Sequence, residues 1–311
     1  MVKPPRLRKG DPVALVSVSS PVPSPGHLDR MIRYLESLDL RVVPSVHVSA
    51  TDGYLAGPDR SRLEDFTEAI LSPITRAIFF AWGGKGANHL LQDIPYQSFR
   101  DNPKIVVGLS DPSCILNALT VRTDVITFHG PTGVNFSEES GLDPYTRESL
   151  IGTLFSDDVR GDLRAHSEWQ VLKPGNAAGR LFGGHLSTIQ TLLGTPFEPN
   201  WDGNILFWEE VGKPARSIDL SLTHFRLAGV FERIAGMIVG RPLGCDDPQT
   251  DAEMDLRRTI LNLCEPYKFP ILFNVDSGHA DPKLTLPIGG MVELVLGDGE
   301  PRFAISESVV E

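Results

Sequence analysis

One serine in the sequence lies where a buried strand is expected to turn into a helix. Residues 105–109 form an apolar run containing Gly108, and Ser110 follows it directly. Pro112 suits the first turn of a helix, because its missing N–H would be unpaired there anyway, and Asp111 is placed to cap that helix. Such a turn lifts a hydroxyl beside a helix N-terminus that favours developing negative charge. Pro112 replaces the second glycine of G-x-S-x-G, however, so spacing alone favours a serine in a capping turn over a nucleophile.

A serine nucleophile needs a base and an acid that orients the base. Among eight histidines, His279 is the most suggestive base, because it lies in the turn-rich loop 276–282 after an apolar run. Ligands and catalytic groups favour that end of a strand in open α/β sheets. The acid candidates are Glu209 and Glu210, which close another apolar run, with Asp276 as a competitor. The residues alone leave this choice open.

A glycine-rich segment, Trp82-Gly83-Gly84-Lys85-Gly86, lies between an expected strand and an expected helix. Such a loop can cradle a phosphate with its backbone amides. It lacks both the G-K-[ST] ending of a P-loop and the G-x-G-x-x-G spacing, so the nucleotide fingerprint is weak. The same uncluttered backbone could supply N–H groups to an oxyanion hole. Since the sequence has no H-E-x-x-H and no close His/Cys cluster, we expect no metal site.

The first half of the chain alternates apolar runs with amphipathic stretches. Strands are predicted at 13–18, 40–46, 77–81 and 105–109, and helices at 27–38, 61–72 and 86–91. Continuous apolar strands separated by helices predict an α/β domain with a parallel sheet covered on both faces.

The second half predicts a smaller mixed α/β domain. Its expected helices are 184–193, 217–232 and 251–263, and its expected strands are 205–208, 236–240, 270–274 and 291–295. The stretch 156–179 is polar and irregular, which indicates a domain junction. We therefore predict two domains, 1–160 carrying the candidate serine and 161–311 carrying the candidate acid and base.

The composition restricts the partners of the protein. Asp and Glu number 40 against 29 Lys and Arg, a net charge of −11, which argues against a nucleic-acid polymer as partner. Three widely spaced cysteines without a C-x-x-C pair are typical of a reduced, cytoplasmic protein. No apolar stretch approaches the roughly 20 residues of a membrane span, and a secretory signal is not expected. The 29 glycines and 25 prolines indicate many special turns.

Ten ordered segments, spread over nearly the whole chain, share their pattern with one known family. They are LVSVSSP at 15–21, GYLAG at 53–57, WGGKG at 82–86, GLSD at 108–111, HGP at 129–131, GRLFGGHLS at 179–187, LGTPF at 193–197, ILFWEE at 205–210, GHADP at 278–282 and LPIG at 286–289. In these segments the chain resembles the serine LD-carboxypeptidase family (the muramoyltetrapeptide carboxypeptidases), and specifically its microcin C immunity protein-like branch.

The resemblance implies a function for five residues. It makes Ser110 the nucleophile, Glu209 the acid and His279 the base of a catalytic triad. It implies an oxyanion hole formed by backbone amides, here those of Gly84 and Asp111. The implied fold is a flavodoxin-like N-terminal domain with a parallel sheet, joined to a smaller barrel-like mixed α/β C-terminal domain, with the site in the cleft between them. The family also implies a homodimer that needs no metal and no organic cofactor.

The chain departs from the family pattern at four positions. Trp82 and Lys85 flank the double glycine where other residue types are usual, His185 replaces the usual Asn, and Glu210 replaces the usual Asp. Since the residue types of the nucleophile, acid and base are kept, we interpret these changes as differences in specificity or in the surroundings of the triad.

The resemblance implies a metal-free serine peptidase or amidohydrolase with two candidate substrates. One is the amide or acyl linkage of a peptidyl- or aminoacyl-nucleotide of microcin C type, which the surroundings of Glu198, Trp201 and Trp208 favour. The other is the L,D bond before the terminal D-Ala of a murein tetrapeptide. Phe136 and Trp169 are candidates for stacking on a nucleobase, although core packing also explains both. A different class, a non-catalytic two-lobed protein that binds small ligands, is disfavoured because it needs no triad.

Overall fold

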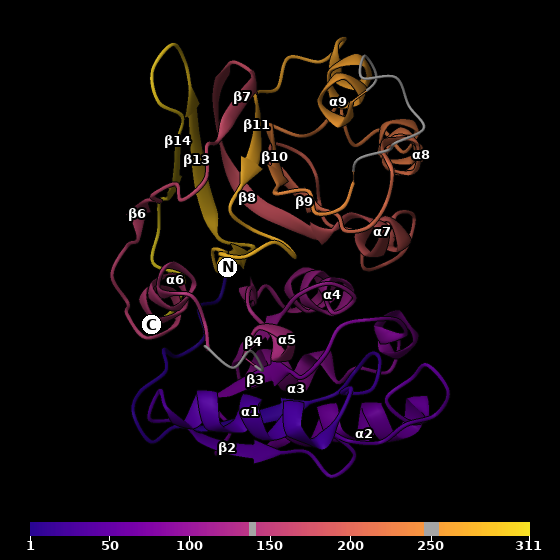
Figure 1. Cartoon of the computed structure of the whole chain (residues 1–311), viewed down its shortest axis with the longest axis vertical. Coiled ribbons are helices and arrows are strands. Elements are labelled where there is room, and N and C mark those ends of the chain that lie inside the picture. The colour runs from indigo at the N-terminus through magenta and orange to yellow at the C-terminus, as the bar shows by residue number, and fades with distance from the viewer. Residues whose placement is uncertain (137–140, 246–254) are drawn as a thin grey trace. The chain divides into compact units, whose positions relative to one another are not determined.

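The computed structural model describes residues 1–136, 141–245 and 255–311 (Figure 1). Contacts within the chain define two compact units. The N-terminal unit consists of Met1–Asp158, Leu284–Gly289 and Val309–Glu311, and the C-terminal unit of Val159–Lys283 and Gly290–Ser308. The units differ from the ranges 1–160 and 161–311 because two short late segments pack within the N-terminal unit.

The N-terminal unit is built on a six-stranded sheet with the order β12-β5-β4-β3-β1-β2. Its strands are β1 (Pro12–Val16), β2 (Arg41–Pro44), β3 (Ala77–Phe80), β4 (Ile105–Gly108), β5 (Thr127–His129) and β12 (Leu286–Ile288). The first five are mutually parallel, and β12 runs antiparallel to β5. The order 2-1-3-4-5 is that of a flavodoxin-like sheet, so the predicted parallel α/β fold is confirmed.

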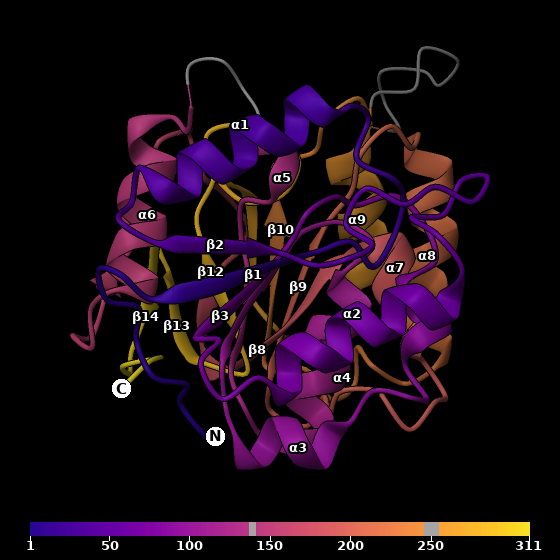
Figure 2. The ribbon, with the colours of Figure 1, turned by 90° about the horizontal axis from the view of Figure 1, so that it is seen from below.

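Helices cover both faces of this sheet, as Figure 2 shows, with α1 and α5 on one side and α2, α3 and α4 on the other. The helices of the unit are α1 (Pro25–Glu36), α2 (Asp59–Leu71), the 3-10 turn η1 (Ala87–Leu90), α3 (Tyr96–Asp101), α4 (Ser113–Thr123), α5 (Gly133–Phe136) and α6 (Pro144–Leu154). All residues of β3 and β4 are buried, as expected of strands covered on both faces.

The C-terminal unit contains an eight-stranded mixed sheet with the order β6-β14-β13-β8-β9-β10-β11-β7. Its strands are β6 (Gly161–Asp162), β7 (Gln170–Lys173), β8 (Gly175–His185), β9 (Ile205–Glu209), β10 (Gly236–Gly240), β11 (Ile271–Val275), β13 (Met291–Leu296) and β14 (Arg302–Ile305). The four central strands from β8 to β11 are parallel, and the outer pairs are antiparallel. The predicted mixed α/β character of the second half is therefore confirmed.

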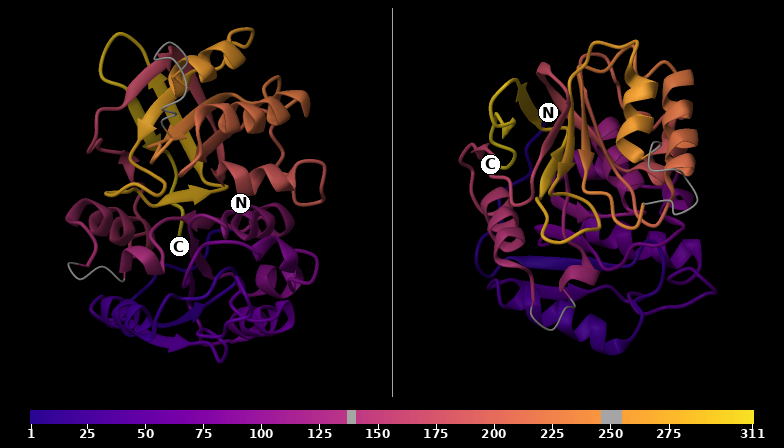
Figure 3. Two further views of the ribbon diagram at one scale, coloured as in Figure 1. Left: turned by 45° about the vertical axis from the view of Figure 1, so that its right-hand side comes forward. Right: turned by 45° about the horizontal axis from the view of Figure 1, so that its top comes forward.

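The helices of the C-terminal unit are α7 (Leu186–Ile189), the 3-10 turn η2 (Gln190–Leu192), α8 (Ala215–Leu227) and α9 (Leu256–Cys264). Figure 3 shows α8 and α9 lying alongside each other, and they pack together beside the parallel strands. Asp255 caps α9 by accepting a hydrogen bond of 2.8 Å from the backbone N–H of Arg258. No helix in the described part of the chain is long and apolar enough to cross a membrane.

Several predicted boundaries in the second half are wrong. The stretch 156–179 is not irregular, since it contains β6, β7 and the first part of β8. These strands lie at the margin of the sheet, where side chains are only partly buried, so they contain polar residues and lack the apolar pattern that predicts a strand. The helix predicted from Gly184 begins at Leu186 because β8 continues to His185, and α8 ends at Leu227 rather than at residue 232. For the helix predicted at 251–263, residues 251–254 lie outside the described residues.

Candidate active site

Ser110 occupies a sharp turn between β4 and α4 in the N-terminal unit. Its φ angle is 68°, a left-handed conformation that is uncommon for a residue with a side chain. The backbone N–H of Ser113 donates to the carbonyl oxygen of Ser110 at 2.9 Å, which closes the turn. Holding a non-glycine residue in this region costs about 1–3 kcal/mol, and such strained residues cluster at functional sites. The backbone therefore has the geometry of a nucleophile elbow.

The glycine-rich loop packs directly against this serine. A Cβ atom added to Gly83 would lie 2.9 Å from Cβ and 3.2 Å from Oγ of Ser110, so only glycine allows this approach. Gly84 has a φ of 111°, and an added Cβ there would lie 2.1 Å from Oγ of Ser20. Ser20 also holds the loop through its N–H, which donates to the Gly83 carbonyl at 3.0 Å. The backbone next to the serine therefore carries no side chains of its own at Gly83 and Gly84 and is held in place by Ser20.

Asp111 does not cap the helix, so that prediction is wrong. Helix α4 begins at Ser113, and its N-cap residue is Pro112, which makes no capping hydrogen bond with its side chain. The Asp111 carboxylate instead accepts a hydrogen bond of 2.8 Å from the backbone N–H of Ala87. This bond ties the turn that carries Ser110 to the end of the glycine-rich loop. The N–H of Ala87 is available for this bond because Ala87 is the first residue of the η1 turn, and the first N–H groups of a helical turn have no partner within the turn.

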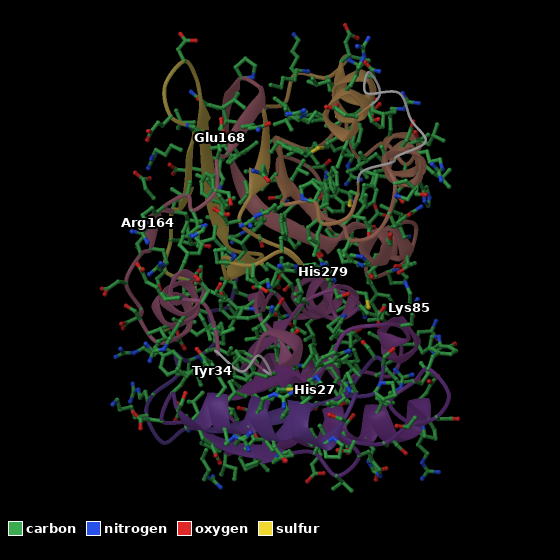
Figure 4. The ribbon with its side chains drawn as sticks, viewed as in Figure 1. His27, Tyr34, Lys85, Arg164, Glu168 and His279 are labelled. Atoms are coloured by element: carbon green, nitrogen blue, oxygen red, sulfur yellow. The ribbon has the colours of Figure 1, made fainter. Side chains whose placement is uncertain are left out.

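Glu209 and His279 meet inside the C-terminal unit. Glu209 is the last residue of β9 and is fully buried, while His279 lies in the loop after β11 with a side chain 20% exposed (Figure 4). Nδ1 of His279 lies 2.7 Å from Oε2 of Glu209, and the backbone N–H of His279 donates to the same oxygen at 3.3 Å. An ionised carboxylate can only accept, so this contact is a hydrogen bond in the tautomer that carries its proton on Nδ1, and in that tautomer Nε2 is the ring nitrogen that can accept a proton.

Two glycines form the walls around the Glu209 side chain. A Cβ atom added to Gly278, whose φ is 113°, would lie 2.7 Å from Oε2 of Glu209. One added to Gly240 would lie 2.8 Å from Cβ of Glu209. The carboxylate therefore has little room to move, and its hydrogen bond to His279 is held in one geometry.

A second histidine–carboxylate pair lies beside the first. Nε2 of His185 is 2.7 Å from Oε1 of Glu210, and the rings of His185 and His279 meet edge to face with centroids 5.3 Å apart. Burial alone would raise the pKa of Glu210, but hydrogen bonds and charge from His185, with further hydrogen bonds from Ser187 and the backbone of Val211, lower it to about 2. In the sequence, His185 stands out only as a departure from a family pattern. The parallel register of β8 and β9 could have located His185 at the site, because it pairs His185 with Glu209.

Asp276, the competing acid, has other partners in the structure. Its carboxylate accepts hydrogen bonds from the backbone N–H groups of His166 and Ser167 and from Nε1 of Trp169, and it pairs with Arg241. Burial alone would raise the pKa of Asp276, but the hydrogen bonds from residues 166–169 lower it below its ordinary value. The carboxylate that contacts His279 is thus that of Glu209.

The two aromatic residues considered for base stacking are both buried. Trp169 is 6% exposed and donates its indole N–H to Asp276. Phe136 is 1% exposed, stacks on Tyr34 with centroids 5.4 Å apart and meets Phe79 edge to face at 5.8 Å. These contacts favour the packing interpretation of both side chains.

The structure thus groups the predicted site residues into two sets. Ser110, Asp111 and the Gly83-Gly84 backbone lie together in the N-terminal unit, and Glu209 and His279 lie together in the C-terminal unit. Within the described ranges, no three His, Cys, Asp or Glu side chains are grouped as metal ligands would be. One set has the geometry of a nucleophile turn, and the other that of an oriented base.

Two family patterns match the chain. The pattern of the LD-carboxypeptidase N-terminal domain matches residues 13–130, and that of the LD-carboxypeptidase C-terminal domain matches residues 178–294. Together they cover more than half of the chain, which therefore belongs to the LD-carboxypeptidase family and is a serine peptidase.

Its relatives include proteins of two described kinds. A probable murein peptide carboxypeptidase of Bacillus subtilis (strain 168) is 33% identical over 312 residues, which cover 99% of this chain and 96% of that protein. The microcin C7 self-immunity protein MccF of Escherichia coli is 26% identical over 332 residues, covering 97% and 94%. The solved structure of MccF in complex with aspartyl sulfamoyl adenosine has a TM-score of 0.93 with this chain, at 24% identity and 100% coverage of both chains, which shows the shared fold.

Proposed function

We propose that the protein hydrolyses an amide linkage with a triad of Ser110, His279 and Glu209, without a metal ion. The observation that carries this proposal is the 2.7 Å contact between Nδ1 of His279 and Oε2 of Glu209. That contact orients an imidazole and leaves its Nε2 ready to take a proton. The left-handed backbone of Ser110 supports the proposal independently, since it is a feature of nucleophile turns.

In the proposed reaction, Nε2 of His279 removes the hydroxyl proton of Ser110 as Oγ attacks the scissile carbonyl carbon. Glu209 stabilises the imidazolium that forms. The backbone N–H groups of Gly84 and Asp111 stabilise the oxyanion, and each such donor contributes about 2.7–4 kcal/mol in the reference cases. His279 then returns the proton to the leaving amine, and a water molecule activated by the same ring hydrolyses the acyl-enzyme.

Replacing the nucleophile tests this proposal. We expect Ser110→Ala to lower kcat by about 10⁶-fold, as removal of a triad serine does elsewhere, with an unchanged melting temperature. Ser98→Ala in α3 is the matched control and should keep the wild-type rate. Mass spectrometry after treatment with a fluorophosphonate should find the adduct on Ser110. Hydrolysis by Ser110→Ala at the wild-type rate would exclude the triad, and a folded protein that forms no adduct would favour the non-catalytic binding protein.

For the substrate, we propose a peptidyl- or aminoacyl-nucleotide of microcin C type. The support is the match of the whole fold to MccF, which has been crystallised with aspartyl sulfamoyl adenosine. The linkage attacked is then the amide or acyl bond between the aminoacyl group and the nucleotide. The acidic net charge argues against binding of a nucleic-acid polymer, because that binding depends on basic side chains along the phosphate backbone. It does not argue against binding of a single nucleotide.

A murein tetrapeptide is the second candidate substrate. The observation favouring it is the 33% identity to a probable murein peptide carboxypeptidase. The bond attacked is then the L,D peptide bond before the terminal D-Ala. Release of aspartate from aspartyl sulfamoyl adenosine and release of D-Ala from the tetrapeptide should be measured with the same preparation, and the larger kcat/KM identifies the substrate class.

Three further predictions concern the state of the protein. We expect a homodimer, which light scattering would detect as twice the chain mass. We expect a chelator such as EDTA to leave kcat unchanged. We also propose a cytoplasmic location, which fractionation of the source cells would test.

A further inference from the structure

His279 lies in a loop without regular secondary structure. Residues 276–283 follow β11 and end at Lys283, where the chain passes into the N-terminal unit. They form bends and irregular backbone rather than helix or strand. The loop therefore lacks the ladder of backbone hydrogen bonds that holds a strand in place. A catalytic imidazole must nevertheless be held within about 0.5 Å of its productive position. Some other interaction must hold this loop.

One side chain contacts both ends of the loop. Arg241 directly follows β10, and its Nη2 donates to Oδ1 of Asp276 at the start of the loop. The same guanidinium reaches the other end, where Nη1 donates to the carbonyl of Asp281 at 2.9 Å and Nη2 to that of Pro282 at 3.0 Å. Its backbone N–H donates to the Ser277 carbonyl at 3.1 Å. Residue 279 lies between these contacts, so Arg241 closes the loop that carries the histidine.

The partner of Arg241 at the start of the loop is itself held firmly. Asp276 is fully buried, and its carboxylate accepts N–H groups from His166 and Ser167 at 2.7 and 3.0 Å and the Trp169 indole N–H at 2.9 Å. These donors favour the charged form of the carboxylate. The planar guanidinium suits this task because it binds several acceptors in a fixed geometry, which an ammonium group cannot do.

We propose that Arg241, anchored on Asp276, is a positioning residue for the catalytic histidine. By joining the two ends of the 276–283 loop, it keeps Nδ1 of His279 on Glu209 and thereby fixes the orientation of the imidazole ring. It acts through the loop and touches neither substrate nor the reacting atoms. This inference rests on the proposed function, since it assigns a task only if His279 activates Ser110.

The test measures activation of the nucleophile without any need to know the natural substrate. The rate at which a fluorophosphonate labels Ser110 is compared for wild type, Arg241→Ala and Arg241→Lys, together with melting temperatures. Arg180→Ala is the matched control. Arg180 lies in β8 of the same unit and forms an ion pair with Glu307 at 3.2 Å, with a side chain 30% exposed against 21% for Arg241.

We expect Arg241→Ala to label about 10²-fold more slowly, the cost of misplacing a catalytic group by about 1 Å. Arg241→Lys keeps the charge beside Asp276 but cannot bridge to both carbonyls. It should therefore label at least tenfold more slowly while its melting temperature stays near that of wild type. Arg180→Ala should label within about twofold of wild type, even where its stability falls.

The results separate failure of this inference from failure of the proposed function. If wild type is not labelled at Ser110, or His279→Ala labels at the wild-type rate, the proposed function fails. If labelling of wild type depends on His279 but either folded Arg241 variant labels at the wild-type rate, the positioning task is refuted. If Arg241→Ala does not fold, Arg241→Lys decides, and loss of the fold in both variants would assign Arg241 to stability alone and overturn the proposal.

Discussion

Gly278 directly precedes His279 and packs against the side chain of Glu209, so its replacement by alanine tests the proposed triad at one point. The added methyl group would lie 2.7 Å from Oε2, 2.8 Å from Cβ and 2.9 Å from Cγ of Glu209. Ordinary contact begins near 3.4 Å, so the carboxylate or the loop must move by about 0.7 Å. The hydrogen bond from His279 cannot keep its geometry through such a movement.

Two costs are expected from Gly278→Ala. The φ of 113° is unfavourable for any residue with a side chain and costs about 1–3 kcal/mol. Overpacking against a buried carboxylate adds about 1–3 kcal/mol. Because a displacement near 1 Å in a catalytic group lowers the rate by about 10²-fold, kcat should fall by that order while KM changes little.

Gly229→Ala is the control for backbone strain. Gly229 belongs to the same unit and has a φ of 76°, but an added Cβ would meet nothing within 4 Å. It should lose about 1 kcal/mol of stability from the strained backbone and keep the wild-type kcat. The assay is hydrolysis of the better substrate under saturating conditions, with thermal melts of each variant. If Gly278→Ala retains a kcat within threefold of Gly229→Ala, the packing of Glu209 against the loop does not position the histidine, and the reasoning fails.

Two further predictions concern the carboxylates at the end of β9. Glu209→Gln should lower kcat by about 10⁴-fold with little change in KM, because an amide stabilises the wrong tautomer of His279, and a rate within tenfold of wild type would count against the triad. The pKa of Glu210 is lowered from 4.5 to about 2 in the fold, so its stabilisation, of the order of 3 kcal/mol, is present above about pH 4.5 and is lost as the pH falls toward 2. Melting temperatures should therefore fall through this window in wild type and fall less steeply in Glu210→Gln, and parallel pH curves for the two proteins would contradict this account.

The N-terminal half of the fold was predictable because its signals are local. The runs that became β1, β3 and β4 are continuous and apolar, as strands buried on both faces must be, and each lies within two residues of its predicted position. The strand β12 was missed for the opposite reason. It is three residues long and pairs with β5, from which it is separated by more than half of the chain, so no local pattern marks it.

The second half was harder to predict because its strands β6 to β8 contain polar and small residues. Two glycines of β8 lie close to the backbone of β9 and of the residues before it. A Cβ atom added to Gly179 would lie 2.5 Å from the carbonyl oxygen of Gly203, and one added to Gly183 would lie 1.7 Å from that of Phe207. In the sequence these glycines indicate turns, whereas in the structure they permit close approach of two backbones. This use of glycine depends on the neighbouring strand and is invisible in one segment alone.

The sequence by itself determined which residue types are available for the chemistry and which family the chain resembles, because motifs such as GLSD at 108–111 and GHADP at 278–282 are contiguous. The residues taken without the resemblance left three carboxylates open as the partner of His279, and only the tertiary structure shows that the one in contact is Glu209, as the resemblance implied. Asp276 is three residues away along the chain but is engaged by Arg241 and residues 166–169, whereas Glu209, 70 residues away, makes the contact. The physical reason is that a buried carboxylate takes the donors that packing brings to it, and parallel strands bring β9 and the end of β11 to the same edge of one sheet.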